Sequence, residues 1–159
     1  MKKIKLTKGK YALVDDDCYE ELSKYTWRCG GGSGRGRGYA VRAIKVNGRM
    51  TSMLMHRQIM RPPEGLETDH INGDRLDNRR DNLRVCTRAE NSFNRTINGN
   101  NTSGYKGVYW YEINKRWGAR IAAGRKQIFL GLFANKEEAA RAYDEAARRL
   151  HGEFARLNF

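Results

Sequence analysis

The sequence has few features that would cross-link the chain through disulfides or zinc, or place it in a membrane. It contains three cysteines, an odd number with no CxxC pair, so neither a disulfide framework nor a cysteine zinc site is indicated. No apolar run approaches the roughly 18 residues that a membrane span needs. The basic N-terminus is not followed by the continuous apolar stretch of a secretory signal. We therefore expect a protein of the reducing cytoplasm that has no membrane partner.

Acidic residues are scarce relative to basic ones. The 159 residues include 31 Lys and Arg but only 18 Asp and Glu, which gives a net charge of +13. The excess is spread along the chain, with 20 basic against 12 acidic residues up to Thr96 and 11 against 6 from Ile97 onward. A polyanion such as a nucleic acid is the simplest partner for so basic a chain. Charge alone also allows a merely soluble basic protein.

Local patterns predict an α+β chain in two parts. The segment 97–104, rich in Asn, Gly, Thr and Ser, is predicted to be a linker between residues 1–96 and residues 105–159. In the first part, residues 4–14 predict two short strands joined at Lys8-Gly9, residues 15–24 a helix, and Asn47-Gly48 a hairpin turn. The last part predicts three strands, 105–111, 117–122 and 127–133. A helix follows, with Asn135 and Glu138 as its capping box and a small-residue stripe that ends with Leu150.

The central stretch is Glu67–Arg95, which reads strand, loop, strand and helix. Asp69 stands directly beside His70, Asn82 lies 12 positions after His70, and Asn91 lies 9 positions after Asn82. Such spacing can wrap two short strands and a helix around one metal ion. An imidazole titrates near neutral pH and can take a proton from water. Oxygen ligands such as Asp69 and Asn91 suit Mg²⁺ or Mn²⁺, and neighbours on a strand point to opposite faces.

These residues closely resemble the HNH nuclease family. The matching segments are Met55-His56-Arg57, Asp69-His70-Ile71-Asn72-Gly73, Leu76-Asp77-Asn78-Arg79, Asp81-Asn82-Leu83-Arg84 and Thr87 through Asn91. The pattern is similar to the subgroup with asparagine in place of the last histidine, found in phage and intron homing endonucleases. The resemblance implies a ββα-metal core at about 53–96, with His70 as general base and Asp69 and Asn91 as ligands of one Mg²⁺ (or Mn²⁺). It gives Asn82 the central structural role of keeping His70 aimed.

Several basic side chains around this stretch are candidates for contact with DNA phosphates. They are His56, Arg57, Arg79, Arg80, Arg84 and Arg95. For His56, a packed side chain and a phosphate or metal-water contact both stay open. For Arg35 and Arg37, phosphate contact and a solvated loop tip stay open. Asp15, Asp16 and Asp17 are expected to cap a helix rather than to form a carboxylate metal cluster. An EF-hand starting at Asp69 is excluded because Arg80 occupies its twelfth position.

The last third of the chain resembles the AP2 DNA-binding domain. The matching segments are Gly104-Tyr105-Lys106-Gly107-Val108, Trp117-Gly118-Ala119, Phe129-Leu130-Gly131, Phe133, Glu137 through Asp144 and Leu157-Asn158-Phe159. The resemblance implies a three-stranded antiparallel sheet packed on one helix. By position it makes Lys106, Tyr109, Arg120, Gln127 and Phe129 the candidates for DNA contact. Trp110 and Trp117 are expected to pack at the core and edge of the sheet.

We therefore expect a small β-rich region, an HNH core and an AP2-like module in one chain. The expected function is sequence-directed cleavage of double-stranded DNA by a homing-type endonuclease, in the cytoplasm of a bacterium or a phage-infected host. A monomer is favoured, and one metal site in a monomer favours a nick. A DNA-binding transcription regulator without catalysis is the alternative. An RNA-binding protein ranks last because no aromatic RNA-stacking signature is visible.

Overall fold

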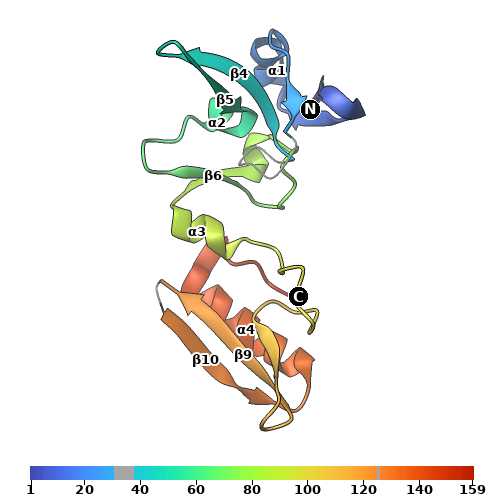
Figure 1. Cartoon of the computed structure of the whole chain (residues 1–159), viewed down its shortest axis with the longest axis vertical. Coiled ribbons are helices and arrows are strands. Elements are labelled where there is room, and N and C mark those ends of the chain that lie inside the picture. The colour runs from blue at the N-terminus through green and yellow to red at the C-terminus, as the bar shows by residue number, and fades with distance from the viewer. Residues whose placement is uncertain (31–37, 125) are drawn as a thin grey trace. The chain divides into compact units, whose positions relative to one another are not determined.

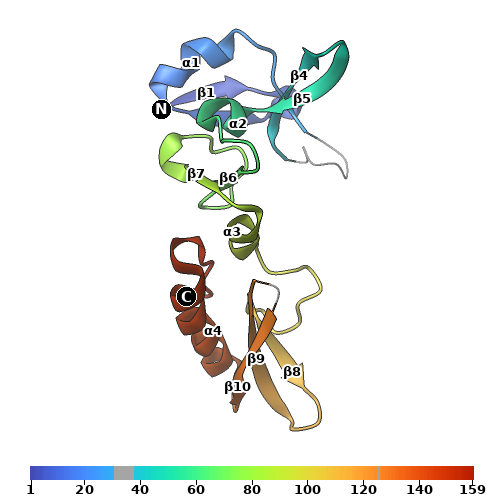
Figure 2. The same cartoon turned by 90° about the vertical axis from the view of Figure 1, so that its left-hand side faces the viewer.

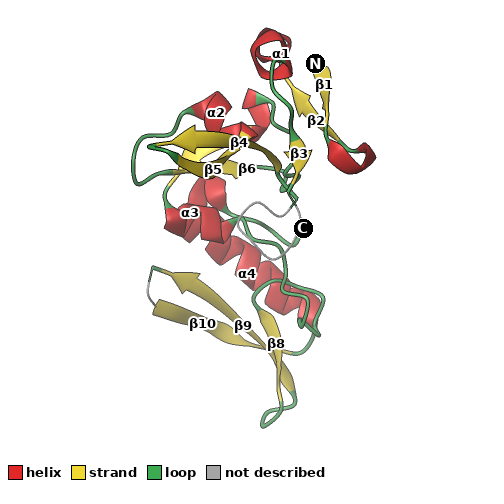
Figure 3. Ribbon diagram, turned by 45° about the horizontal axis from the view of Figure 1, so that its top comes forward, coloured by secondary structure: helices red, strands yellow, loops and turns green. Residues whose placement is uncertain are grey.

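The computed structural model describes residues 1–30, 38–124 and 126–159, so Arg35 and Arg37 lie outside the described residues. Helices and small antiparallel sheets are mixed along the chain (Figure 3), which confirms the α+β prediction. The chain divides into two compact units, Met1–Arg88 and Ala89–Phe159, and each is described by itself. The predicted linker 97–104 falls within the second unit of this division. No helix among the described residues is long and apolar enough to cross a membrane.

The first unit is built from short strands with two helices. Its elements are β1 (Lys2–Lys5), β2 (Tyr11–Val14), α1 (Asp16–Ser23), β3 (Arg28–Cys29), β4 (Ala40–Val46), β5 (Arg49–Leu54), α2 (Met55–Met60), β6 (Glu67–His70) and β7 (Leu83–Cys86), with 3-10 turns at Thr7–Gly9 and Arg80–Asn82 (Figure 1). Strand β1 pairs with β2, β3 with β4, β4 with β5, and β6 with β7, all antiparallel. The predicted hairpins at Lys8-Gly9 and Asn47-Gly48 and the strand pair that carries Asp69 and His70 are therefore confirmed.

The core of the first unit forms around Trp27, whose side chain is only 2% exposed. The indole Nε1 donates to the carbonyl oxygen of Leu22 at 2.8 Å, so the polar atom of the ring is satisfied inside the core. Val14 and Met55 belong to the same apolar cluster, which joins the N-terminal hairpin and α1 to the start of α2. Burial of this cluster fixes the start of α2, the helix that contacts β6.

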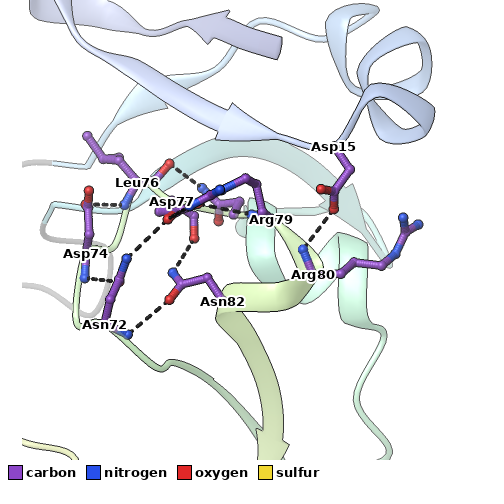
Figure 4. A network of polar contacts seen from close by, with 9 residues as sticks. Asp15, Asn72, Asp74, Leu76, Asp77, Arg79, Arg80 and Asn82 are labelled. Carbon is purple, nitrogen blue, oxygen red and sulfur yellow. Dashed lines mark hydrogen bonds and ion pairs between the residues drawn. The ribbon is translucent and has the colours of Figure 1, made fainter. Parts of the chain in front are cut away.

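The first turn of α1 differs in one respect from the prediction. Asp15 occupies the N-cap position, but its side chain makes no capping hydrogen bond. Its Oδ2 accepts instead from the backbone N of Arg80 at 2.8 Å (Figure 4). The prediction that Asp15 caps the helix is therefore wrong, because a distant loop amide takes the carboxylate. Asp16 and Asp17 do lie in the first turn, where negative charge opposes the helix dipole.

The second unit places one long helix against one face of a three-stranded sheet. Its elements are α3 (Arg88–Phe93, whose first residue closes the first unit), β8 (Val108–Tyr111), β9 (Arg116–Ala123), β10 (Lys126–Phe133), α4 (Lys136–His151) and a 3-10 turn at Gly152–Phe154. The sheet is antiparallel in the order β10-β9-β8, and α4 lies along it (Figure 2). Three strands followed by a helix are what the sequence predicts.

The helix α4 starts as predicted and ends with a small change. The Asn135 side chain accepts from the backbone N of Glu138 at 2.8 Å, which confirms the cap. The alanines of the predicted stripe are buried, which lets the helix lie close to the sheet. Leu150, however, is 37% exposed, whereas the next residue, His151, is only 7% exposed. The stripe therefore ends on His151, four residues after buried Ala147, and not on Leu150.

Candidate functional site

Asp69 and His70 end the strand β6 and point to opposite faces of the β6–β7 pair. Asp69 is the register partner of Arg84, and His70 is the partner of Leu83. Because side chains alternate along a strand, the carboxylate and the imidazole have different surroundings although they are neighbours in sequence. Both side chains are buried, at 8% and 4% exposed.

The Asp69 carboxylate is paired with Arg84 from the neighbouring strand. Its Oδ2 accepts from Arg84 Nη2 at 2.9 Å and from Arg84 Nε at 3.1 Å. The hydrogen bonds of this pair are charge-assisted because they join a guanidinium to a carboxylate. Both side chains are largely shielded from water, so the pair is partly desolvated. An anionic oxygen donor held in this way suits a hard divalent cation.

His70 lies in a small group of rings on the other face of β6. Its ring centroid is 4.8 Å from that of His56, with the planes at 79°, and 5.8 Å from that of Tyr39. Its Nε2 lies 3.4 Å from Oδ1 of Asn78. Burial lowers the pKa of His70 below 6.5, although the Asn78 contact and the charge of Asp69 act in the opposite direction. The imidazole is therefore neutral at neutral pH.

His56, at the start of α2, is packed rather than exposed. Its side chain is 4% exposed, and burial together with the charges of His70 and Arg57 lowers its pKa to about 3. The Nδ1 atom is buried without a hydrogen-bond partner among the described residues. The packed side chain that the sequence allowed is therefore what the structure contains. A phosphate contact by His56 stays a prediction.

The loop between β6 and β7 is held by its own amides and carboxylates (Figure 4). Asn82 Oδ1 accepts from the backbone N of Asn72 at 3.0 Å, and Asn82 Nδ2 donates to the carbonyl of Asp77 at 2.8 Å. Asn72 Nδ2 in turn donates to Asp77 Oδ2 at 3.1 Å. Asn82 thus bridges backbone across the loop, while its role of keeping His70 aimed stays a prediction.

Asn78 is the residue of this loop that contacts His70, a contact that the spacing of the motif does not predict. It is fully buried, and its Nδ2 donates to the carbonyl of Leu76 at 3.1 Å, which leaves Oδ1 to face the imidazole. A signal was present in the loop, which contains two Asp-Asn pairs, Asp77-Asn78 and Asp81-Asn82. Spacing alone does not tell which of the two amides reaches His70.

The candidate DNA-contacting arginines of the first unit fall into two groups. Arg79 forms a bidentate pair with Asp77 at 2.6 and 2.7 Å, and Arg80 pairs with Asp17 at 2.5 Å. Together with Arg84, these side chains already have carboxylate partners. Arg57 is exposed, and its Nη2 lies 3.5 Å from the carbonyl of Leu66. Their contacts with DNA stay predictions.

Asn91 and Arg95 belong to the second unit, on and just after α3. Asn91 is half-buried in the second turn of that short helix, the position that the sequence predicts. No cluster of three or more His, Cys, Asp and Glu side chains suited to a metal occurs among the residues described. Metal binding by Asp69 and Asn91 stays a prediction.

The β8–β10 sheet presents its other face away from α4. Tyr109 pairs in register with Gly118, Phe129 with Arg120, and Gln127 with Ala122, which places these side chains on that face. The Arg120 guanidinium lies 4.9 Å from the Tyr109 ring centroid. A Cβ atom at Gly118 would come within 2.7 Å of this ring, so the glycine lets Tyr109 lie flat on the sheet. Lys106, the fifth candidate, precedes the sheet, and its ammonium donates to the carbonyl of Phe93.

Known proteins are similar to this chain in two regions, the HNH motif and the last third of the chain. Residues 61–93 match the model of an HNH endonuclease family. The chain is 30% identical to an uncharacterized HNH endonuclease of Acanthamoeba polyphaga mimivirus over 95% of this chain and 76% of that protein. It is 38% identical to Protein 3.8 of Escherichia phage T7 over 60% of this chain and 78% of that protein.

The last third of the chain has a second set of relatives. It is 48% identical over 58 residues to an AP2/ERF and B3 domain-containing protein of Oryza sativa subsp. japonica, which is 36% of this chain and 16% of that protein. The plant match is therefore confined to one domain. The mimivirus protein, in contrast, is matched over most of both chains, and the family model covers Asp69, His70, Asn82 and Asn91. The chain therefore belongs to the HNH endonuclease family and carries an AP2-type region at its C-terminal end.

Proposed function

We propose that the chain is a homing-type endonuclease that cuts double-stranded DNA with one divalent cation. The observation that carries the proposal is the pair Asp69–His70 at the end of β6, where an anionic carboxylate and a neutral imidazole face opposite sides of one strand. Hydrolysis of a phosphodiester needs a base for the attacking water and positive charge near the phosphate. His70 is the base for the water, and Asp69 would hold the cation that supplies the positive charge.

His70 acts as the general base in this proposal. Its lowered pKa keeps the imidazole neutral at neutral pH, which is the form that accepts a proton. The Oδ1 atom of Asn78 can only accept a hydrogen bond, so it favours the tautomer with hydrogen on Nε2. The basic lone pair then belongs to Nδ1. The Asn82 bridges hold the loop that carries Asn78, and so keep the ring of His70 aimed.

Asp69 and Asn91 are the proposed ligands of the metal. Both offer oxygen, the donor that Mg²⁺ and Mn²⁺ prefer, and Arg84 Nη2 donates to Oδ2 of the Asp69 carboxylate. A divalent cation held by these two residues would neutralise charge on the phosphate and stabilise the departing oxygen. The protein's part is to hold the oxygen ligands and to keep the imidazole of His70 neutral.

The remaining basic residues hold the DNA. Arg57 and Arg95 form no ion pair among the described residues, so their charge is available to phosphates at once. The other three arginines, Arg79, Arg80 and Arg84, are paired with carboxylates. To contact a phosphate, each must leave its carboxylate partner or bind the carboxylate and the phosphate together. In the second unit, the sheet face with Tyr109, Arg120 and Gln127 lies against a groove of the DNA, as the sheet of an AP2-type domain would. Lys106 lies near the phosphate backbone of the DNA.

Plasmid nicking tests the proposal. Supercoiled DNA carrying fragments of the source genome is incubated with the full chain in Mg²⁺, in Mn²⁺ and in EDTA. We expect metal-dependent nicking that disappears in Asp69→Ala and in His70→Ala. Asp81→Ala, an exposed carboxylate in the same loop, is the matched control and should cut like the wild type. Cutting that persists in EDTA or in Asp69→Ala would overturn the one-metal mechanism.

Binding measurements separate a nuclease from a transcription regulator. His70→Ala should abolish nicking and leave the affinity for a DNA duplex nearly unchanged, because the imidazole is buried and needed only for chemistry. A chain that binds one duplex tightly in EDTA yet cuts it in no metal is the regulator. Duplex DNA and hairpin RNA compared at one salt concentration decide between DNA and RNA as the partner.

A further inference from the structure

The short helix α3 ends the nuclease motif in sequence but is built into the second unit. The HNH family model extends to Phe93, whereas the second unit begins at Ala89. Five of the six residues of α3 therefore pack with the AP2-type region. Asn91, the proposed metal ligand, is one of them. What holds α3 in the second unit consequently also decides where Asn91 points.

The first contact is a ring stack between α3 and α4. The rings of Phe93 and His151 lie parallel, with centroids 3.7 Å apart and planes 5° from each other. His151 Nε2 lies 2.7 Å from the carbonyl oxygen of Ala122 in β9 and must donate to it, because a carbonyl only accepts. This hydrogen bond fixes the plane of the imidazole. Burial lowers the pKa of His151, so the ring that faces Phe93 is neutral.

The second contact is made by Lys106 at the C-terminal end of α3. Its ammonium donates to the carbonyl of Phe93, the last residue of the helix, where positive charge is favourable. The backbone of Lys106 is itself held, because its N donates to Asn158 Oδ1 at 2.7 Å. Asn158 is in turn bonded to the buried carboxylate of Asp144. Burial and the charge of Arg156 lower the pKa of Lys106 to about 8, so the ammonium form persists at neutral pH.

We propose that Phe93, His151 and Lys106 are positioning residues for the metal ligand Asn91. Asn91 lies two residues before Phe93 on a helix of six residues, so the orientation of the last turn sets the direction of its side chain. The stack fixes one side of that turn and the ammonium fixes its end. The AP2-type region would then orient a metal ligand in addition to holding DNA. This inference rests on the proposed function, in which Asn91 binds the metal.

A brace of this kind differs measurably from ordinary packing. Loss of ordinary packing lowers the stability of the second unit and leaves the affinity for metal unchanged in the protein that stays folded. Loss of a positioning contact weakens metal binding by about tenfold, as is typical when a group that orients a ligand is removed. Metal affinity, measured without DNA, is therefore the quantity that separates the two.

The test is a Mn²⁺ titration of the full chain, followed by electron paramagnetic resonance of the free ion. Phe93→Leu should weaken Mn²⁺ binding about tenfold. Phe93→Tyr keeps an aromatic ring for the stack and should bind Mn²⁺ with the affinity of the wild type. Phe159→Leu is the matched control, since Phe159 is an aromatic ring of the same unit whose ring lies against Tyr105 and Arg141. Affinity for duplex DNA in EDTA should be the same in all of these proteins.

Lys106→Met is the second variant, with Lys106→Arg as its conservative partner, and it keeps the test decisive if Phe93→Leu does not fold. Lys106→Met should weaken Mn²⁺ binding and Lys106→Arg should restore it. Wild-type affinity in Lys106→Met or in folded Phe93→Leu, alongside weak binding in Asn91→Ala, overturns this inference alone. Wild-type affinity in Asn91→Ala shows instead that Asn91 is not a ligand, and both the inference and the proposed metal site then fail.

Discussion

His56 and His70 meet edge to face in the interior of the first unit, with ring centroids 4.8 Å apart and planes at 79°. One ring comes from α2 and the other from β6, and each is 4% exposed. A proton on either ring would be placed in a buried site beside the other ring. The contact therefore links the stability of the unit to pH as well as to packing.

Replacement of His56 by Phe should flatten the acid dependence of stability. The folded-state pKa of His56 is about 3, below the ordinary 6.5, so the unfolded chain binds this proton first as the pH falls. Stability is lost from about pH 6.5 down to about pH 3, at a slope of about 1.4 kcal/mol per pH unit for one group. Urea unfolding at several pH values measures this slope. His56→Phe should show a slope smaller by about one proton, and an unchanged slope contradicts the assignment.

Asn78→Leu should slow cutting without weakening DNA binding. The substitution keeps the approximate size of the side chain but removes the Oδ1 atom that faces His70 Nε2 at 3.4 Å. The imidazole can then adopt the wrong tautomer or orientation, and kcat should fall by about 10- to 100-fold, as for other orienting partners. Single-turnover nicking gives the rate and a binding titration gives the affinity. Asn100→Leu, at an exposed position, is the control. Equal losses in Kd and rate would assign Asn78 to DNA binding instead.

The sequence predicts the elements well where the pattern is local. The strands β6 and β7, the hairpin at Asn47-Gly48 and the Asn135 cap all follow from short stretches of residues, and the structure contains each. These features depend on turn chemistry and alternation, which act between near neighbours.

Contacts between distant parts of the chain could not be read from the same patterns. Asp15 accepts from Arg80, 65 positions away, and so it does not cap its own helix. Trp27 becomes the centre of a core only when α1 and α2 close over it. The choice between Asn78 and Asn82 as the partner of His70 depends on how the loop folds back. Each of these depends on tertiary packing, which overrides local preference.

Arg84→Met should destabilise the first unit more than the double change Asp69→Leu with Arg84→Met. The single substitution leaves a carboxylate only 9% exposed without the guanidinium beside it, which costs about 3 kcal/mol. Removal of both charges leaves two apolar side chains on neighbouring strands and is close to neutral by comparison. Urea unfolding in EDTA measures both. If the double variant loses as much as the sum of the two single variants, the pair is not coupled.

Gly107→Ala should strongly destabilise the second unit. A Cβ atom there would lie 2.1 Å from the Tyr143 ring and 2.7 Å from the carbonyl oxygen of Arg120, and the backbone has a φ of +78°. Overpacking and left-handed strain together should cost about 3 kcal/mol or more. Gly104→Ala has a φ of +80° in open space and isolates the strain, at about 1 kcal/mol. Gly99→Ala has neither feature, and thermal unfolding should leave it unchanged. Equal melting temperatures for Gly104→Ala and Gly107→Ala would show that the Tyr143 ring moves aside to make room for the added methyl group. The close packing of α4 against Gly107 would then not be what holds the neighbouring Lys106 in place.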